Sequence, residues 1–130
     1  MDTAKLTVTF SLTGDKYFDP FEFSAKTGIT ATKQWRLGEN HRGGQRRHSF
    51  WSYSQETAED GSAEACFASV LETARLALAR LDSHDGIEPQ LAVRITVPRR
   101  EATGLFVDAE QVRTLAAMGA ALDVLVEVHD

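Results

Sequence analysis

Alternation of apolar and polar residues predicts strands near both ends of the chain. Apolar residues alternate with Lys, Thr and Ser over residues 5–12, and the same period recurs over 91–97 and 121–128. Successive side chains of a strand point to opposite faces, so each stretch predicts a strand with one buried face. The apolar sets are Leu6, Val8, Phe10 and Leu12, then Leu91, Val93, Ile95 and Val97, then Leu122, Val124, Val126 and Val128.

Apolar spacings of three and four predict a long helix over about 62–83, between two strands. Its apolar residues are Phe67, Val70, Leu71, Ala74, Leu78 and Leu81. Two shorter helices are marked by their ends. Asp19 with Glu22, and Asp108 with Gln111, have the spacing of a capping box, and Gly28 and Gly119 can end the two helices. We expect their buried residues to be Phe21 or Phe23 with Ala25 in the first, and Val112, Leu115 and Ala116 in the second.

Three further strands complete the prediction, at 29–37, 49–54 and 104–107, with a glycine-rich hairpin loop before the second of them. The resulting order is β-α-β-β-α-β-β-α-β. The sequence therefore predicts an α+β fold, a single domain over residues 1–130 with a mixed sheet and helices mainly on one face. The first six elements match the split β-α-β arrangement of ferredoxin-like folds.

Several short motifs are spread along almost the whole chain. They are Asp19-Pro20-x-Glu22, Gly28-Ile29, Trp35-x-x-Gly38, the later Trp51, and Leu115-x-x-x-Gly119-x-x-Leu122-Asp123-Val124. In this pattern the chain resembles a bacterial domain family of unknown function, whose members have about 130 to 140 residues. Ala31 stands where that family commonly has proline, and Glu127 where it often has an aromatic residue. The resemblance implies a stand-alone cytoplasmic domain and supplies no catalytic residue.

Composition and charge narrow the setting. The 130 residues are 42% hydrophobic, which is enough for one core, and the formal net charge is −5. The lone Cys66 cannot form an intramolecular disulfide, and no apolar run resembles a secretion signal or a membrane span. We therefore expect a cytoplasmic protein without general electrostatic attraction to nucleic acid or membranes.

Familiar catalytic patterns are absent from the sequence. His41, His48, His84 and His129 lack the paired spacing of metal ligands, and neither a phosphate-binding loop nor a dinucleotide fingerprint occurs. Cys66 lies in the first turns of a predicted helix, where a thiol can be activated, but no base accompanies it in the sequence. We therefore expect neither a metal nor a cofactor, and the sequence favours a binding function over catalysis.

One segment concentrates positive charge. Residues 33–48 hold five Lys and Arg residues against Glu39, a local charge of +4 that leaves −9 for the other residues. Arginines interleaved with aromatic residues suit phosphate groups, nucleic-acid bases or a protein interface. The alternative is that the tryptophans pack in the fold beneath arginine side chains. The candidate binding residues are Trp35, Arg36, His41, Arg42, Arg46, Arg47, His48 and Trp51.

Two functions compete on this basis. The first is a non-enzymatic protein-binding module, such as an immunity or antitoxin-like protein, whose acidic cluster of Glu56, Glu59, Asp60 and Glu64 faces a basic partner. The second is a nucleic-acid or anionic-ligand binder that uses the hairpin loop 41–48. An enzyme would need a pocket that joins His41 or His48 to a carboxylate. The sequence favours the first function.

Overall fold

A five-stranded sheet organises the fold. The computed structural model describes residues 5–57, 61–98 and 105–129. Within these residues the strand order is β2-β5-β1-β6-β7. The strands are β1 (Lys5–Gly14), β2 (Lys33–Trp35), β5 (Ser49–Glu56), β6 (Glu88–Pro98) and β7 (Ala121–His129). In this sheet the β6–β7 pair is parallel, and the other three pairs are antiparallel. The sheet is therefore mixed, and β1, β2 and β5 form the predicted split β-α-β unit.

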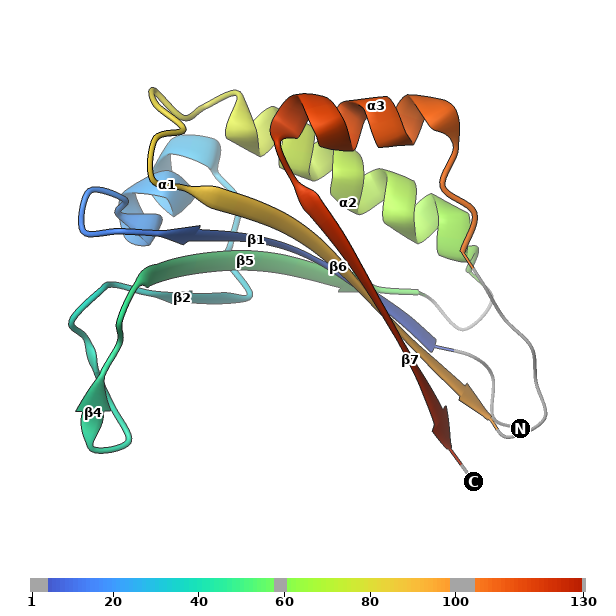
Figure 1. Cartoon of the computed structure of the whole chain (residues 1–130), viewed down its shortest axis with the longest axis horizontal. Coiled ribbons are helices and arrows are strands. Elements are labelled where there is room, and N and C mark those ends of the chain that lie inside the picture. The colour runs from blue at the N-terminus through green and yellow to red at the C-terminus, as the bar shows by residue number, and fades with distance from the viewer. Residues whose placement is uncertain (1–4, 58–60, 99–104, 130) are drawn as a thin grey trace.

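Three helices lie on one face of this sheet (Figure 1). They are α1 (Pro20–Thr27), α2 (Ala63–Leu78) and α3 (Ala109–Met118). The longest, α2, packs on β1 and β5, while α3 packs on α2 and β7. The α+β class and the one-sided helical layer are thus confirmed. None of the described helices has the length and apolar character needed to cross a membrane.

The core lies between α2 and the central strands. Strand pairing sets Phe10 opposite Leu91, and Leu12 opposite Trp51, so their side chains share the face beneath the helices. Trp51 is fully buried and lies edge-on to Phe23, with ring centroids 4.8 Å apart. Its Nε1–H donates to Ser24 Oγ at 2.9 Å. Trp51 therefore ties α1 to the sheet.

Capping side chains fix the ends of the short helices. The Asp19 carboxylate accepts hydrogen bonds from the backbone N–H groups of Phe21 and Glu22, and Gly28 ends α1 with φ 75°. Asp108 and Gln111 form a complete capping box at α3. At α1 the box is incomplete, because the Asp19 N–H donates no hydrogen bond to the Glu22 carboxylate. Asp19 instead pairs with Arg36, whose Nε lies 3.2 Å from Oδ1.

Two predicted strands and one predicted loop differ from the structure. The strand expected over 29–37 is reduced to β2, because ladder pairing with β5 covers only Lys33–Trp35. Residues 105–107 do not form the expected strand, since they pair with no described strand while Leu105 and Val107 pack on the core; Gly104 lies outside the described residues. The loop before β5 contains a small ribbon of its own, β3 (Asn40–His41) with β4 (Gly44–Gln45).

Some predicted core positions on the short helices are wrong. Phe23 and Pro20 are the buried residues of α1, whereas Ala25 is exposed. In α3, Leu115 and Met118 are buried, and Val112 and Ala116 are exposed. Leu115 and Met118 lie one turn apart on the part of α3 that packs on α2 and β7, so burial of this helix is confined to that turn.

Gly14 provides a test of packing at the end of β1. A Cβ added there would lie 2.7 Å from Phe18 Cβ, and Phe18 is buried in the core. We expect Gly14→Ala to lower the free energy of unfolding by about 1–3 kcal/mol, as overpacked sites do. The matched control is Gly44→Ala, whose Cβ would meet only the His41 carbonyl oxygen at 3.8 Å. Urea unfolding of both variants checks this, and equal midpoints would contradict it.

Asp19 provides a test of pH dependence. Burial acts to raise the pKa of Asp19, but hydrogen bonds from Arg36 and the α1 N–H groups and the charge of Arg36 lower it on balance below 3.8. The stability that its charge contributes is present above pH 3.8 and is lost as the pH falls through the folded-state pKa. Because the carboxylate is partly exposed, we expect at most about 1 kcal/mol.

Asp19→Asn keeps a capping oxygen and removes the charge. The wild type is expected to be the more stable at about pH 6, and the difference should vanish towards about pH 2. Asp19→Ala also removes the cap and should cost about 1 kcal/mol even at the lower pH. Thermal unfolding at each pH measures both effects. A difference between wild type and Asp19→Asn that stays constant across this range would show that the charge has no role.

Candidate functional site

Trp35 lies between two other side chains at the start of the basic segment. Its indole stacks on Phe50, with centroids 4.5 Å apart and planes 18° from parallel. The Arg46 guanidinium carbon lies 3.7 Å from the Trp35 centroid, so the two partners occupy opposite faces of the ring. Arg46 Nη2 also lies 3.0 Å from His41 Nδ1. The structure thus brings together three of the predicted residues, with both aromatic faces of Trp35 covered.

The other predicted residues do not join this group. Arg36 lies over the Phe21 ring at 4.3 Å and bonds Asp19, so it is directed to α1. The remaining candidates, Arg42, Arg47 and His48, are exposed around the ribbon. Trp51 is removed from the candidate surface, because its complete burial in the core leaves it no contact with solvent. The basic segment therefore presents charge without a free aromatic platform.

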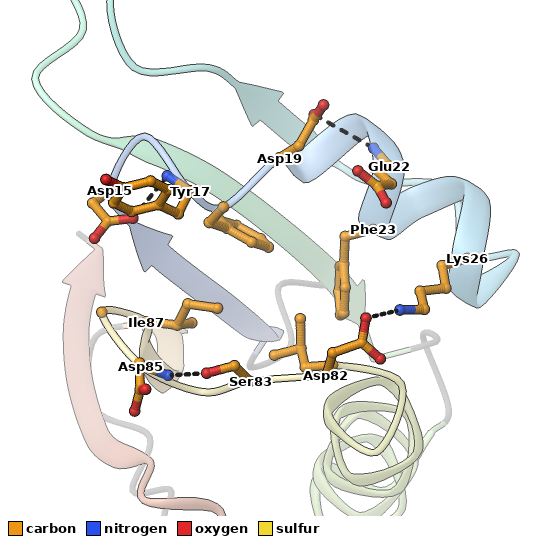
Figure 2. A pocket seen from close by; sticks show the side chains of 13 residues that line it. Asp15, Tyr17, Asp19, Glu22, Phe23, Lys26, Asp82, Ser83, Asp85 and Ile87 are labelled. Carbon is orange, nitrogen blue, oxygen red and sulfur yellow. Dashed lines mark hydrogen bonds and ion pairs between the residues drawn. The ribbon is translucent and has the colours of Figure 1, made fainter.

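The better-formed pocket lies between α1 and the connection from α2 to β6. Its volume is about 430 Å³, within the range of small-molecule and side-chain binding sites. Figure 2 shows α1 along one side and residues 82–87 along the other, with Phe23 and Ile87 between them. Phe18, Phe23, Leu81 and Ile87 supply its apolar part. The cavity has an apolar interior where the first helix meets the loop after the second.

The polar lining of this pocket is acidic. Five carboxylates line it against one lysine, Lys26; they are those of Asp15, Asp19, Glu22, Asp82 and Asp85. Two of the five are paired, Asp19 with Arg36 and Asp82 with Lys26, at 3.2 and 2.9 Å. Asp15, Glu22 and Asp85 form no ion pair with a cation in the described ranges. We name this feature the acidic pocket.

Local hydrogen bonds hold the two walls in shape. Asp15 Oδ1 accepts from the Tyr17 N–H at 2.9 Å, and Ser83 Oγ accepts from the Asp85 N–H at 3.2 Å. Tyr17 itself is exposed at the mouth, with its side chain toward Asp15 (Figure 2). Asp15 and Asp85 therefore stand on turns that are stabilised by a side-chain hydrogen bond, from the Tyr17 N–H to the Asp15 carboxylate and from the Asp85 N–H to the Ser83 hydroxyl. This preorganisation lowers the entropy lost when a ligand enters.

The sequence does not reveal the acidic pocket, because its walls lie about sixty residues apart in the chain. Each wall reads locally as a turn or a helix start, and the capping function of Asp19 explains its presence without any ligand. The signal available is a clustering of acidic residues at two segments of the chain, 15–22 and 82–85. Only the sheet order shows that these connections meet.

Catalytic chemistry finds little support at either surface. Burial raises the pKa of the Cys66 thiol, which disfavours the reactive thiolate, and Cys66 Sγ donates to the Gln55 carbonyl oxygen at 3.7 Å. Across residues 5–57, 61–98 and 105–129, no group of three or more His, Cys, Asp or Glu residues lies close enough to hold a metal ion.

Comparison with known proteins gives one match. The chain matches the family described as Domain of unknown function (DUF4279) over residues 4–129, nearly its whole length. No curated protein and no solved structure matches it. The family assignment agrees with the resemblance seen in the motifs from Asp19 to Val124. The chain therefore belongs to the DUF4279 family, a domain family of unknown function.

Proposed function

We propose that this chain is a non-enzymatic protein-binding module that takes a positively charged side chain of a partner protein into the acidic pocket. The carrying observation is the pocket itself, with an apolar interior and three carboxylates that no described cation neutralises. A lysine or arginine side chain fits such a site, because its aliphatic part packs on apolar groups while its charged end meets carboxylates.

The overall charge supports the same kind of partner. A net charge of −5 attracts a basic protein over distances beyond direct contact and raises the association rate. An immunity or antitoxin-like protein that blocks a basic toxin is one function of this kind. The binding surface differs from the acidic cluster expected from the sequence, of which Glu59 and Asp60 lie outside the described residues.

The alternative is a nucleic-acid or anionic-ligand binder that uses the basic ribbon. Its supporting observation is a hollow lined in part by Lys33, Arg42 and Arg46. Two observations weigh against it. Base stacking on Trp35 would require displacement of Arg46 from the ring, and Trp51 is buried. The acidic pocket is therefore the stronger candidate.

A defined cationic probe tests the proposal. We expect a fluorescent Arg- and Lys-rich peptide to bind the wild type, with affinity that falls as salt is added. Glu22→Gln combined with Asp85→Asn should weaken binding about tenfold, equivalent to about 1.4 kcal/mol, because it removes two of the three unpaired carboxylates that line the pocket. Fluorescence anisotropy at two salt concentrations measures this. Circular dichroism establishes that the double variant is folded.

Matched controls separate the pocket from general charge. Glu56→Gln combined with Glu64→Gln removes the same two charges from the other acidic cluster and should leave binding within about twofold of wild type. Equal weakening by both pairs would contradict the pocket and indicate nonspecific attraction. Tight binding of a labelled single-stranded oligonucleotide, lost on substitution of Arg42, Arg46 and Arg47 by alanine, would support the alternative instead.

A further inference from the structure

Exposed apolar side chains gather at one edge of the sheet, on β7 and the segment before it. Ten large apolar side chains are exposed among the described residues, and seven of them fall between residues 106 and 128. These seven, 40–72% exposed, are Phe106, Val112, Leu122, Val124, Leu125, Val126 and Val128. They belong to α3, the segment before it, and β7. Apolar surface concentrated in this way marks an interaction site far more often than apolar residues scattered singly.

The strand that carries most of them is also an open edge. β7 pairs with β6 on one side, and no described strand pairs with its other side. Its face toward the helices carries Leu122, Val124, Val126 and Val128, without a charge among them. Natural edge strands are normally protected by charges, proline or a covering element. This face of β7 carries no charge and no proline, and α3, which contacts β7, leaves its four apolar side chains 40–63% exposed. The backbone hydrogen-bonding groups of the open edge and the apolar face are therefore available together.

We propose that β7 pairs with β7 of a second copy of this chain, antiparallel across a two-fold axis, to give a homodimer with one continuous ten-stranded sheet. Such an interface is self-complementary, because each copy offers the same unpaired edge and the same apolar face. The helices of both copies then lie on the same side of the joined sheet. The apolar faces of the two β7 strands meet beneath them.

The charges of β7 select the register. On the face away from the helices β7 carries Asp123 and Glu127, and Glu127 pairs with Arg94 at 3.3 Å. A two-fold axis at Leu125 would set Asp123 opposite Glu127 of the second copy, which is repulsive. An axis at Val124 sets Leu122 opposite Val126 of the second copy and Asp123 opposite Leu125 of the second copy. An axis at Val126 likewise keeps the carboxylates apart. Two β7 strands can therefore pair with the axis at Val124 or at Val126, and charge repulsion disfavours the register with the axis at Leu125.

The surface is large enough for a stable dimer. The seven exposed side chains present several hundred Å² of apolar area per copy. The nine residues of β7 add an edge roughly 30 Å long, at about 3.3 Å per residue. A specific interface buries about 800 Å² per partner, and the exposed apolar side chains together with the open edge of β7 are the surface that this pairing would bury. The acidic pocket is lined by α1, which contacts β2 and β5 on the side of the sheet opposite to β7 (Figure 1), so dimerisation through β7 leaves it open.

Sedimentation velocity over about 1 µM to about 1 mM tests the proposal. The wild type is expected to reach 28.6 kDa, twice the 14.3 kDa chain. Val124→Lys combined with Val126→Lys places charges on the apolar face and should leave a folded monomer of 14.3 kDa by circular dichroism and sedimentation. The matched control is Leu76→Lys, a similarly exposed apolar residue on α2, which should remain dimeric. A wild type monomeric throughout, or a loss of dimer in the control alone, would overturn the proposal.

Single cysteines test the register without altering charge. In a Cys66→Ser background, cysteine at the axis residue faces itself at a Cα separation of about 4.5–5.5 Å, within the range of a disulfide. Val124→Cys or Val126→Cys should therefore form a covalent dimer on mild oxidation, and Leu125→Cys should not. A covalent dimer from Leu125→Cys alone would overturn the charge argument. No covalent dimer from any of the three would overturn the pairing itself.

Discussion

The two-sided pairing of β1 is the constraint on which this structure depends. β1 is hydrogen-bonded to β5 on one side and to β6 on the other, in registers that keep their apolar residues on one face. A shift of one residue in either pairing would turn four apolar side chains of β1 away from α2. These registers place Trp51 opposite Leu12, and Trp51 in turn holds α1 against the sheet. They also bring together the two distant segments that line the acidic pocket.

The two candidate surfaces show how the same kind of residue acquires different roles. Arginine at 46 covers an aromatic ring, whereas arginine at 36 neutralises a helix-capping carboxylate. Both are satisfied by the protein itself. The carboxylates at 15, 22 and 85 have no such partner among the described residues, and they surround an apolar hollow. Local pairing, more than net charge, therefore distinguishes a surface prepared for a partner from one that serves the fold.

Much of the fold can be predicted from the sequence because its signals are local. Alternation in β1 and β6 and the caps at Asp19, Asp108 and Gly28 reflect the geometry of single elements, and they are reproduced. The errors arise where tertiary contacts decide: residues 105–107 are apolar and extended, but no neighbouring strand is available to them. The acidic pocket was missed for the same reason, since only the strand order unites its walls. The helical period predicts that Val112 is buried, but only Leu115 and Met118 of α3 are buried and Val112 is exposed.

The central position of β1 also affects how the chain is made. β1 is synthesised before either neighbour, and its second neighbour, β6, begins at residue 88. At about 5–20 residues per second, translation of the intervening 73 residues takes roughly 4–15 s. During that interval one edge of the strand that holds Leu6, Val8, Phe10 and Leu12 has no native partner. The centre of the sheet is thus completed only late in synthesis. Until β6 has been made, the unpaired edge of β1 needs protection by the ribosome or by chaperones.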